Sequence, residues 1–549
     1  MKIRIGIMAM LCMCIISSLA FADPVVAKVE RDEVPMNAYR GNEEITEVII
    51  PDYALSIGLG AFSNCKNLRS VTISEGVEEI QINAFFGCSS LTDIFIPSSV
   101  SLIEQTAFDN CTNLRSITVA PDNPVYESID GVLFDGINHI LIHYPSAKAN
   151  KVYEVPKNTK GIRPQTYNYL EKIILPEGME RIDSGAIQAC YTLRSIELPD
   201  SLISLESASI IRCRQLSDVQ LPPNLKTIGD SVFFDCSISQ ISIPESVTSI
   251  GSLAYGGCPI EELYIPKALT SIGGAAFAGC RELRKIQVDP ENPIYEAKDN
   301  VLFNKAEGKL VLYPAGLGSA YSIPYGIKSI GKGAFWSNIT IAQLEIPDTV
   351  EEICEDAFRM TKMLKSVVIP ESVKKIGNGA FCDSDLEIIT LPQGLESLEY
   401  GAFKGANIAS ITIPDGIKCI QDSTFGSCNH LKNIDLPKNL ISIGDWAFSN
   451  CRELESIEIP EKTQSIGKNA FIGCESLKEV HFKGESLTSI GEEAFRDCVS
   501  LQTIHIPNSV TNIGGNAFIG CSEELVLIVG PGSVAEKYAQ SYGINYVYR

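Results

Sequence analysis

The sequence has few of the residues and none of the motifs on which most catalytic, cofactor and metal sites depend. Its 549 residues include only five histidines. We find no HExxH, P-loop, GxSxG, EF-hand or dinucleotide-binding pattern, and the cysteines form no CxxC pair. These absences argue against an enzyme, and they lead us to expect no cofactor and no bound metal.

The sequence is also short of positive charge. It has 45 lysines and arginines against 67 aspartates and glutamates, which gives a formal charge of −22. A chain this acidic is expected to be soluble and to repel nucleic acid and anionic membranes. Many of the acidic residues occupy variable positions of a repeat, so we interpret most of them as a solvated outer face.

What the sequence has instead is a phrase that returns about every 23 residues. At 443–460 it reads IGDWAFSNCRELESIEIP, and its general form is IGxxAFxxCxxLxxIxIP. This fixed period lies in the leucine-rich-repeat range and predicts a solenoid of stacked coils. The aromatic position marks seventeen coils, at Phe62, Phe85, Phe108, Ile187, Ile210, Phe233, Tyr255, Phe277, Phe335, Phe358, Phe381, Phe403, Phe425, Phe448, Phe471, Phe495 and Phe518.

Each repeat predicts one short strand and one short helical turn. The LxxIxI segment alternates apolar and polar residues with the period of a strand, and a proline such as Pro460 usually ends it. Stacked coils would place these strands in one parallel sheet with rungs about 4.8 Å apart. The aromatic residues would then form a spine through the core. We therefore predict a β-rich, curved leucine-rich-repeat solenoid.

The breaks in the repeat suggest four parts. We interpret residues 1–22 as a signal peptide and 23–44 as an N-terminal cap without the repeat. The solenoid is predicted over 45–528, and a small α/β cap over 529–549. In the last part, Ser533 is expected to begin a short helix that ends at Gly543, with a final strand after it.

The first of these parts carries the localisation prediction. Lys2 and Arg4 precede an apolar stretch that ends in a small-x-small cleavage site at residues 20–22. A lipoprotein leader is the alternative, although neither Cys12 nor Cys14 follows the small residues that lipidation requires. No second long hydrophobic stretch follows. We therefore expect secretion to an extracellular or cell-surface location, with no membrane span.

Two insertions interrupt the solenoid, near 120–156 and 289–324. The first reads PDNPVYESIDGVLFDGINHILIHYP and the second PENPIYEAKDNVLFNKAEGKLVLYP. Both pass from Asn-Pro-x-Tyr through Val-Leu-Phe and a polar turn to an apolar run that ends in Tyr-Pro. This pattern predicts inserted β-hairpins. Repeat insertions tend to lie on one face, so the edge that carries them is a candidate binding edge.

Thirteen cysteines stand three residues after the aromatic marker. Where this position lacks cysteine it holds Asn338, Thr361, Ser384 or Ala406, all small residues. Side chains stacked in parallel do not converge as a disulfide requires, so we expect free, buried thiols. Cys354, Cys382 and Cys419 lie off this ladder and, if exposed, are expected to oxidise first.

The middle residue of each LxxIxI strand is expected to line the concave face of the sheet, where a partner could bind. His481 and His505 occupy this position on adjacent coils. They could form a two-histidine metal or ligand contact, or they could simply be two exposed residues. Our candidate partner contacts are Phe95, Glu197, Tyr264, Glu345, Asp435, Glu458, His481 and His505.

The phrase IGxxAFxxCxxLxxIxIP resembles the BspA-like, treponemal-type class of leucine-rich repeats. The resemblance covers nearly the whole chain after the leader, including the NPxY…GVLF…YP insertions and the ending GSVAEKYAQSYGINY. It implies a secreted or surface-exposed bacterial protein, and some relatives are adhesins that contact host matrix proteins. The class has no motif that defines binding residues. This sequence also lacks the visible anchor of surface-attached relatives.

Together these observations favour a non-catalytic extracellular binding or adhesion module. Its partner would be an extracellular protein, from a host matrix or cell surface, or a glycan. It would bind through the concave sheet or the edge with the insertions. A structural protein of envelope assembly is the alternative, and an enzyme is the third hypothesis. The sequence indicates neither the particular partner nor the oligomeric state.

Overall fold

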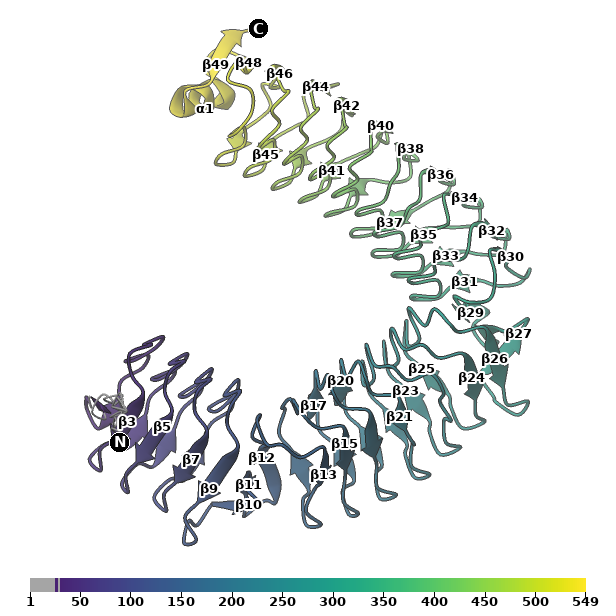
Figure 1. Ribbon diagram of the computed structural model, residues 1–549. Coiled ribbons are helices and arrows are strands. Elements are labelled where there is room, and N and C mark those ends of the chain that lie inside the picture. Colours follow the sequence, from purple (N-terminus) through teal and green to yellow (C-terminus); the bar gives the residue numbers. More distant parts are fainter. Residues whose placement is uncertain (1–24, 28–29) are drawn as a thin grey trace, which may run out of the picture. The chain divides into compact units, whose positions relative to one another are not determined.

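The computed structural model describes residues 25–27 and 30–549. Two compact units make up the chain, Met1–Ala149 and Asn150–Arg549. The predicted signal peptide, 1–22, lies outside the described residues. Both units consist of stacked coils with parallel strands, as the repeat predicted (Figure 1).

Most coils contribute two short strands and a turn. In a typical coil, β42 (Ser456–Ile459) is followed by Pro460, then by β43 (Ser465–Ile466), and then by a turn through Phe471. We call the strands of the first kind the strand row and those of the second kind the second row. Equivalent residues pair between coils, as Ile457 does with Val480.

The first unit contains both rows. Its strand row comprises β1 (Val25–Val26), β3 (Glu47–Ile50), β5 (Ser70–Ile73), β7 (Asp93–Ile96) and β9 (Ser116–Val119). Its second row comprises β2 (Glu33–Val34), β4 (Ser56–Ile57), β6 (Glu79–Ile80) and β8 (Leu102–Ile103).

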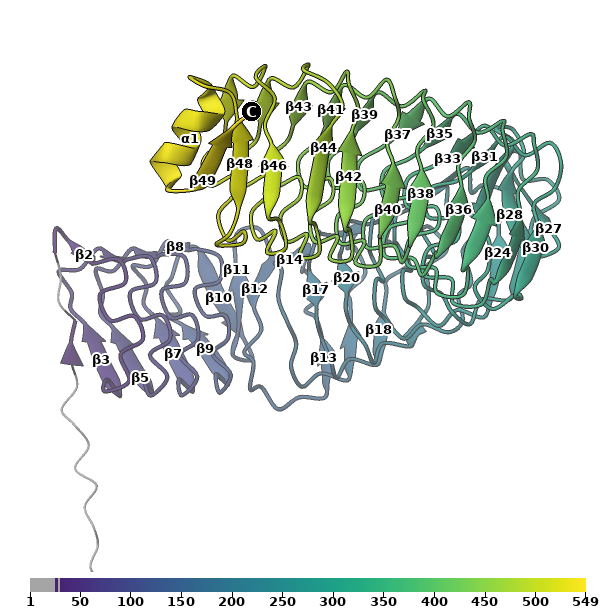
Figure 2. The same cartoon turned by 90° about the horizontal axis from the view of Figure 1, so that it is seen from above.

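The second unit continues the same pattern, and Figure 2 shows the strands from β36 to β48 lying side by side. Its strand row comprises β13 (Val152–Glu154), β15 (Lys172–Ile174), β18 (Ser195–Glu197), β21 (Asp218–Val219), β24 (Glu262–Ile265), β26 (Lys285–Val288), β30 (Ala320–Ser322), β32 (Gln343–Glu345), β34 (Ser366–Val368), β36 (Ile388–Thr390), β38 (Ser410–Thr412), β40 (Asn433–Asp435), β42, β44 (Glu479–Phe482), β46 (Thr503–His505) and β48 (Val526–Val529). Its second row comprises β14 (Gly161–Ile162), β16 (Arg181–Ile182), β19 (Ser204–Leu205), β22 (Thr227–Ile228), β23 (Ser249–Ile250), β25 (Ser271–Ile272), β31 (Ser329–Ile330), β33 (Glu352–Ile353), β35 (Lys375–Ile376), β37 (Ser397–Leu398), β39 (Cys419–Ile420), β41 (Ser442–Ile443), β43, β45 (Ser489–Ile490) and β47 (Asn512–Ile513). Two additional short strands, β17 (Ile187–Gln188) and β20 (Ile210–Ile211), pair where isoleucine replaces the aromatic marker.

The strand row of the second unit lies on the outer side of the bend of that unit. Figure 1 shows β30 to β46 of this row outside and β31 to β45 of the second row inside. The hydrogen bonding agrees, because the strand row divides into pairs such as β38–β40 and β42–β44, whereas β39-β41-β43-β45-β47 is one sheet. Strands on the outside of a bend are spread beyond the spacing of about 4.8 Å that a ladder needs. The expectation of a concave strand row is therefore wrong for this unit.

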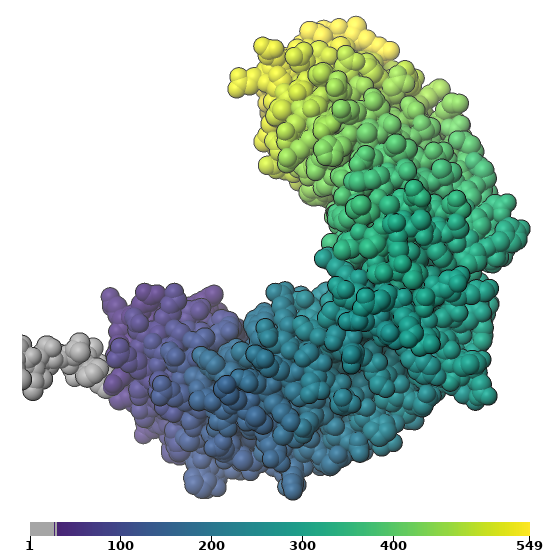
Figure 3. Space-filling model, turned by 45° about the vertical axis from the view of Figure 1, so that its right-hand side comes forward, coloured from purple at the N-terminus to yellow at the C-terminus, as the bar shows by residue number. Residues whose placement is uncertain are grey.

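The aromatic markers form the predicted spine. From Phe335 to Phe518, consecutive ring centroids are 4.9–5.6 Å apart and nearly parallel. These rings lie in one continuous apolar core of the second unit. The coils of the second unit are packed closely against one another in the space-filling view of Figure 3. Stacked aromatic pairs add about 0.5–1.5 kcal/mol each beyond the area that they bury.

Two tyrosines extend the spine beyond the markers read from the sequence. Tyr39 stacks on Phe62 at 5.0 Å, and β2 pairs with β4, so the segment 33–44 contains a coil. This corrects the interpretation of 23–44 as a cap without the repeat. Tyr313, at the end of the second insertion, stacks on Phe335 at 5.0 Å. An aromatic ring suffices for the spine, even where the rest of the phrase is absent.

The cysteine ladder also has a hydrogen-bonding role. The thiol of Cys88 donates to the carbonyl of Phe62 in the preceding coil at 3.1 Å, and Cys474 does the same to Phe448. The hydroxyl of Thr361 instead donates to Phe358 of its own coil at 2.9 Å. The position therefore favours a small side chain with a donor. All sixteen cysteines within the described residues are free.

We expect thiol reagents to distinguish the cysteines by burial. Cys419 is half-buried, and Cys521 is half-buried with its pKa lowered by a hydrogen bond from the thiol of Cys498. Burial raises the pKa of Cys354 to about 11 and that of Cys111 to about 12, which lowers their thiolate populations. Maleimide should therefore label Cys419 and Cys521 first in the native protein, as peptide mass spectrometry would show.

If the buried cysteines of the ladder were labelled at the same rate as Cys419, this expectation would be contradicted. Labelling in denaturant is the control, because all thiols are then accessible to the reagent. The sequence grouped Cys382 with the exposable thiols. In the structure it is buried, so it is expected to react as slowly as the buried cysteines of the ladder.

Each insertion is a three-stranded antiparallel sheet, one strand more than a hairpin. The first contains β10 (Tyr126–Ile129), β11 (Val132–Asp135) and β12 (Ile140–His143). The second contains β27 (Tyr295–Lys298), β28 (Val301–Asn304) and β29 (Lys309–Leu312). The last of these strands pairs with β31, so the second insertion joins the second row directly.

The Asn-Pro-x-Tyr motif attaches each insertion to the preceding coil. In the second insertion, the amide of Asn292 donates to the carbonyls of Pro266 and Leu269, at 2.8 and 2.9 Å. The hydroxyl of Tyr295 accepts from the backbone N–H of Ile272 at 2.9 Å. Asn123 and Tyr126 make the equivalent bonds in the first unit. The motif is thus explained by attachment to the solenoid.

The C-terminal end has the predicted helix and strand. Ser533 caps α1 (Val534–Tyr542) by accepting from the N–H of Glu536 at 3.1 Å, and Gly543 ends the helix in the left-handed conformation. Beyond it, β49 (Asn545–Tyr548) pairs in parallel with β48. Across 25–27 and 30–549, no helix is long and apolar enough to cross a membrane.

Candidate functional site

The outward positions of the strand row form the candidate site. In β42, for example, the side chains alternate between exposed and buried, with Ile457 and Ile459 inside and Glu458 outside. The strand period fixes this alternation. All eight residues predicted as partner contacts lie on strands of the row, Phe95 in the first unit and the other seven in the second.

Several of the predicted contacts already have partners within the chain. Tyr264 is exposed, and its hydroxyl donates to Asp289 at 2.9 Å, which raises the pKa of the phenol. Glu345 accepts from the hydroxyl of Ser322 at 2.6 Å, and Glu197 forms an ion pair with Lys172. Exposed ion pairs contribute at most about 1 kcal/mol, so a partner could displace these contacts cheaply.

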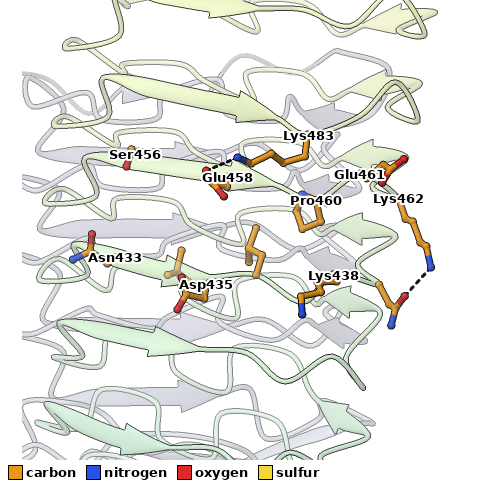
Figure 4. Close-up of a pocket in the computed structure, with 12 residues that line it drawn as sticks. Asn433, Asp435, Lys438, Ser456, Glu458, Pro460, Glu461, Lys462 and Lys483 are labelled. Carbon is orange, nitrogen blue, oxygen red and sulfur yellow. Dashed lines mark hydrogen bonds and ion pairs between the residues drawn. The ribbon is translucent and has the colours of Figure 1, made fainter.

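A groove opens in the strand row between β40 and β42. Its volume is about 740 Å³, and Figure 4 shows Asp435 and Glu458 near its centre. It lies at one of the places where the ladder is interrupted, since these two strands belong to different sheets. Its lining residues are Asn433, Ile434, Asp435, Leu436, Lys438, Asn439, Ser456, Glu458, Pro460, Glu461, Lys462 and Lys483.

Charges of both signs surround this groove. Glu458 accepts from the ammonium of Lys483 at 2.6 Å, and Asp435 accepts from the hydroxyl of Thr412 at 3.0 Å. Lys462 donates to the side chain of Asn439 at 2.8 Å. Donors and acceptors on one open surface suit a polar partner. No catalytic arrangement is visible among these side chains.

Each of the two histidines has contacts of its own. His481 contacts Glu479 of its own strand, with 2.9 Å between Nε2 and Oε2. His505 is half-buried, and burial lowers its pKa, with Arg549 lowering it further. Within the described part of the chain, no group of three or more histidine, cysteine or acidic side chains is placed to hold a metal.

Sequence reasoning missed other exposed residues of the row. Val368 is 70% exposed and Ile388 is 67% exposed, and they lie on the paired strands β34 and β36. Their β-branched side chains suit a strand whether or not a partner covers them. The lysines of the groove were also missed, because Lys438 and Lys462 follow the strands rather than lie on them. No pattern in the repeat distinguishes these lysines.

Sequence comparison identifies the repeat. The description "BspA type Leucine rich repeat region" matches residues 32–152, 144–260, 248–305, 319–428 and 396–524. The chain belongs to the BspA-type leucine-rich-repeat family. Proteins of this family are commonly surface or binding proteins. The match begins at residue 32, which agrees with the early coil around Tyr39. No curated protein matches the chain.

Three solved structures of leucine-rich repeat proteins are similar to this chain. A leucine-rich repeat protein from Eubacterium ventriosum is 20% identical with a TM-score of 0.46, covering 68% of this chain and 91% of that one. One from Bacteroides ovatus is 24% identical with a TM-score of 0.39, covering 70% and 93%. A leucine rich cell surface protein from Faecalibacterium prausnitzii is 22% identical with a TM-score of 0.40, covering 66% and 96%.

Proposed function

We propose that this BspA-type chain is a non-catalytic extracellular binding or adhesion module that recognises a protein or glycan. The observation that carries the proposal is the strand row. Its inward residues are uniformly apolar, whereas its outward residues differ from coil to coil, with acidic, aromatic, aliphatic and histidine side chains. Packing explains the inward residues. A specific partner would recognise this varied outward surface.

The groove at Asp435 and Glu458 is the part of the row that we propose as a contact centre. It is hollowed, polar and open, and it presents exposed carboxylates beside Lys438 and Lys462. Polar contacts of both signs fix the register of a partner more than they add affinity. The edge of each unit that carries its insertion remains a second proposed contact. The proposed location, outside the cell, rests on the leader at 1–22 and on the family.

A binding screen tests this function directly. Residues 23–549 would be immobilised and probed with extracellular matrix proteins and a glycan array. We expect at least one reproducible partner, and the double substitution Asp435→Lys, Glu458→Lys should weaken its binding by about tenfold or more, equivalent to about 1.4 kcal/mol. The affinity would be measured by surface plasmon resonance. Loss of the exposed Glu458–Lys483 pair should cost at most about 1 kcal/mol of stability.

Glu455→Lys is the matched control, because Glu455 belongs to the same coil and pairs with Lys478 at 3.3 Å but does not line the groove. An equal loss of affinity in this variant would show that only overall charge matters. Self-association of the chain without any partner would favour the envelope-assembly alternative. Turnover abolished by a single side-chain change would instead show an enzyme.

A further inference from the structure

The two tryptophans of the chain both lie in the turns that carry the aromatic spine. Trp336 directly follows Phe335, and Trp446 stands two residues before Phe448. These turns follow the second row in each coil, and neither tryptophan lines the groove. Trp446 is 42% exposed. Large aromatic side chains that remain exposed are typical contact residues of interfaces.

Trp446 also occupies a strained backbone position. Its φ is +58°, in the left-handed region, where a bulky residue is a genuine outlier. The coil before it holds Ser423 at the same position, with φ +55°, and the coil after it holds Asn469, with φ +54°. Asparagine tolerates this conformation better than a bulky residue does. Folding would therefore favour glycine or asparagine here. A strained, exposed indole points to a use other than stability.

Trp336 is an example of a tryptophan in these turns that contacts an arginine. The guanidinium carbon of Arg359 lies 5.2 Å from the centre of the Trp336 ring. The same guanidinium contacts the carboxylate of Asp356 at 3.1 Å and that of Asp383 at 3.9 Å. Arginine suits such a site because its planar cation stacks on an aromatic face and bonds carboxylates with the same group.

Trp446 also has carboxylates near it in the chain, although at other positions of the turn, since Asp445 directly precedes it. Asp422 and Asp445 are exposed on neighbouring coils, and Asp422 accepts from the N–H of Asp445 at 2.7 Å. Lys468, the equivalent of Asp445 in the next coil, bonds Glu492 at 2.5 Å. Within the described residues, the pair of Arg359 and Trp336 is the one cation–π contact.

A second exposed ring continues this surface. Tyr400 is 52% exposed, and the next residue, Gly401, donates its N–H to the carbonyl of Asp422 at 3.0 Å. Asp422 therefore lies beside Tyr400, and Asp445 follows one coil later. The coils here are spaced by 5.6 and 5.5 Å between spine rings. We call Tyr400, Asp422, Asp445 and Trp446 the Trp446 ridge.

We propose that the Trp446 ridge is a docking site for an exposed arginine side chain of a protein partner. The guanidinium would stack on the indole of Trp446 and contact Asp422 and Asp445. This is the same combination of ring and carboxylates that Arg359 contacts, at other positions of the turn, in Trp336, Asp356 and Asp383. The net charge of −22 complements a basic partner. This inference is independent of the proposed contact at the groove.

The test measures the binding of a probe, acetylated hexa-arginine amide, to the full chain. Calorimetry and tryptophan fluorescence report this binding. We expect Trp446→Asn to weaken binding of this probe by about tenfold, within the range of cation–π energies. The variant should melt at the wild-type temperature or higher, because asparagine relieves the left-handed strain. Hexalysine should bind less tightly to the wild type and should lose little in the variant.

Leu253→Asn is the matched control, because Leu253 has φ +54° at the same position of another coil. It should leave hexa-arginine binding unchanged. The double substitution Asp422→Asn, Asp445→Asn should weaken binding and flatten its salt dependence. Unchanged affinity in Trp446→Asn would overturn the proposal. So would a large drop in its melting temperature, which would assign the indole to packing, or tighter binding of maltohexaose than of hexa-arginine.

Discussion

Phe448→Ala is expected to lower the free energy of unfolding of the second unit by about 3–5 kcal/mol. The ring is fully buried, and it stacks on Phe425 at 5.5 Å and on Phe471 at 5.2 Å. Its removal leaves a cavity that the two neighbouring coils cannot close without breaking the hydrogen bonds between their own strands. In a solenoid, each coil is stabilised by its neighbours, so the loss should spread along the stack.

Urea denaturation and hydrogen exchange together measure this effect. Exchange protection should fall in the mutated coil and in those of Phe425 and Phe471, and it should recover with distance. Tyr264→Ala is the control, because it removes an exposed aromatic side chain from the same unit and should cost roughly 1 kcal/mol or less. Equal losses in the two variants would contradict a spine that holds the coils together.

The sequence predicted those parts of the fold that depend on the residues of one coil. The alternation of LxxIxI determines which side chains face the core, and the aromatic position marks the spine. Tyr39 escaped notice because the surrounding segment lacks both the phenylalanine and the cysteine of the phrase. Tyr313 was visible in the Tyr-Pro ending of the insertion, but its role depends on its position against Phe335 in the next coil.

The candidate site was less predictable, because it depends on how neighbouring coils are spaced. The strand period shows that Glu458 faces outward, but it does not show on which side of the unit the neighbouring strands are spread apart. Stretching divides the strand row into pairs, and the groove between β40 and β42 follows from that division. Trp446 was visible in the phrase IGDWAF, but its strain appears only in the backbone angles.

His143 should make the stability of the first unit depend on pH. The side chain is buried at the end of β12, with Asp109 as its charged neighbour, at 3.6 Å between Nδ1 and Oδ1. Burial lowers the pKa of His143 to about 4, from an ordinary value of 6.5. As the pH falls, His143 of the unfolded chain therefore takes up a proton near pH 6.5, whereas His143 of the folded unit stays neutral until about pH 4. Stability should fall by about 2 kcal/mol between pH 7 and pH 5.

Hydrogen exchange of the segment 126–144, corrected for the pH dependence of the intrinsic rates, would measure this loss. His143→Leu provides the comparison, because Leu312 occupies the equivalent position of the second insertion and is also buried. This variant should keep the same protection at pH 7 and pH 5. Burial raises the pKa of Asp109, so its own protonation favours the folded state and cannot cause the loss. A wild-type pH dependence in His143→Leu would place the titrating group elsewhere.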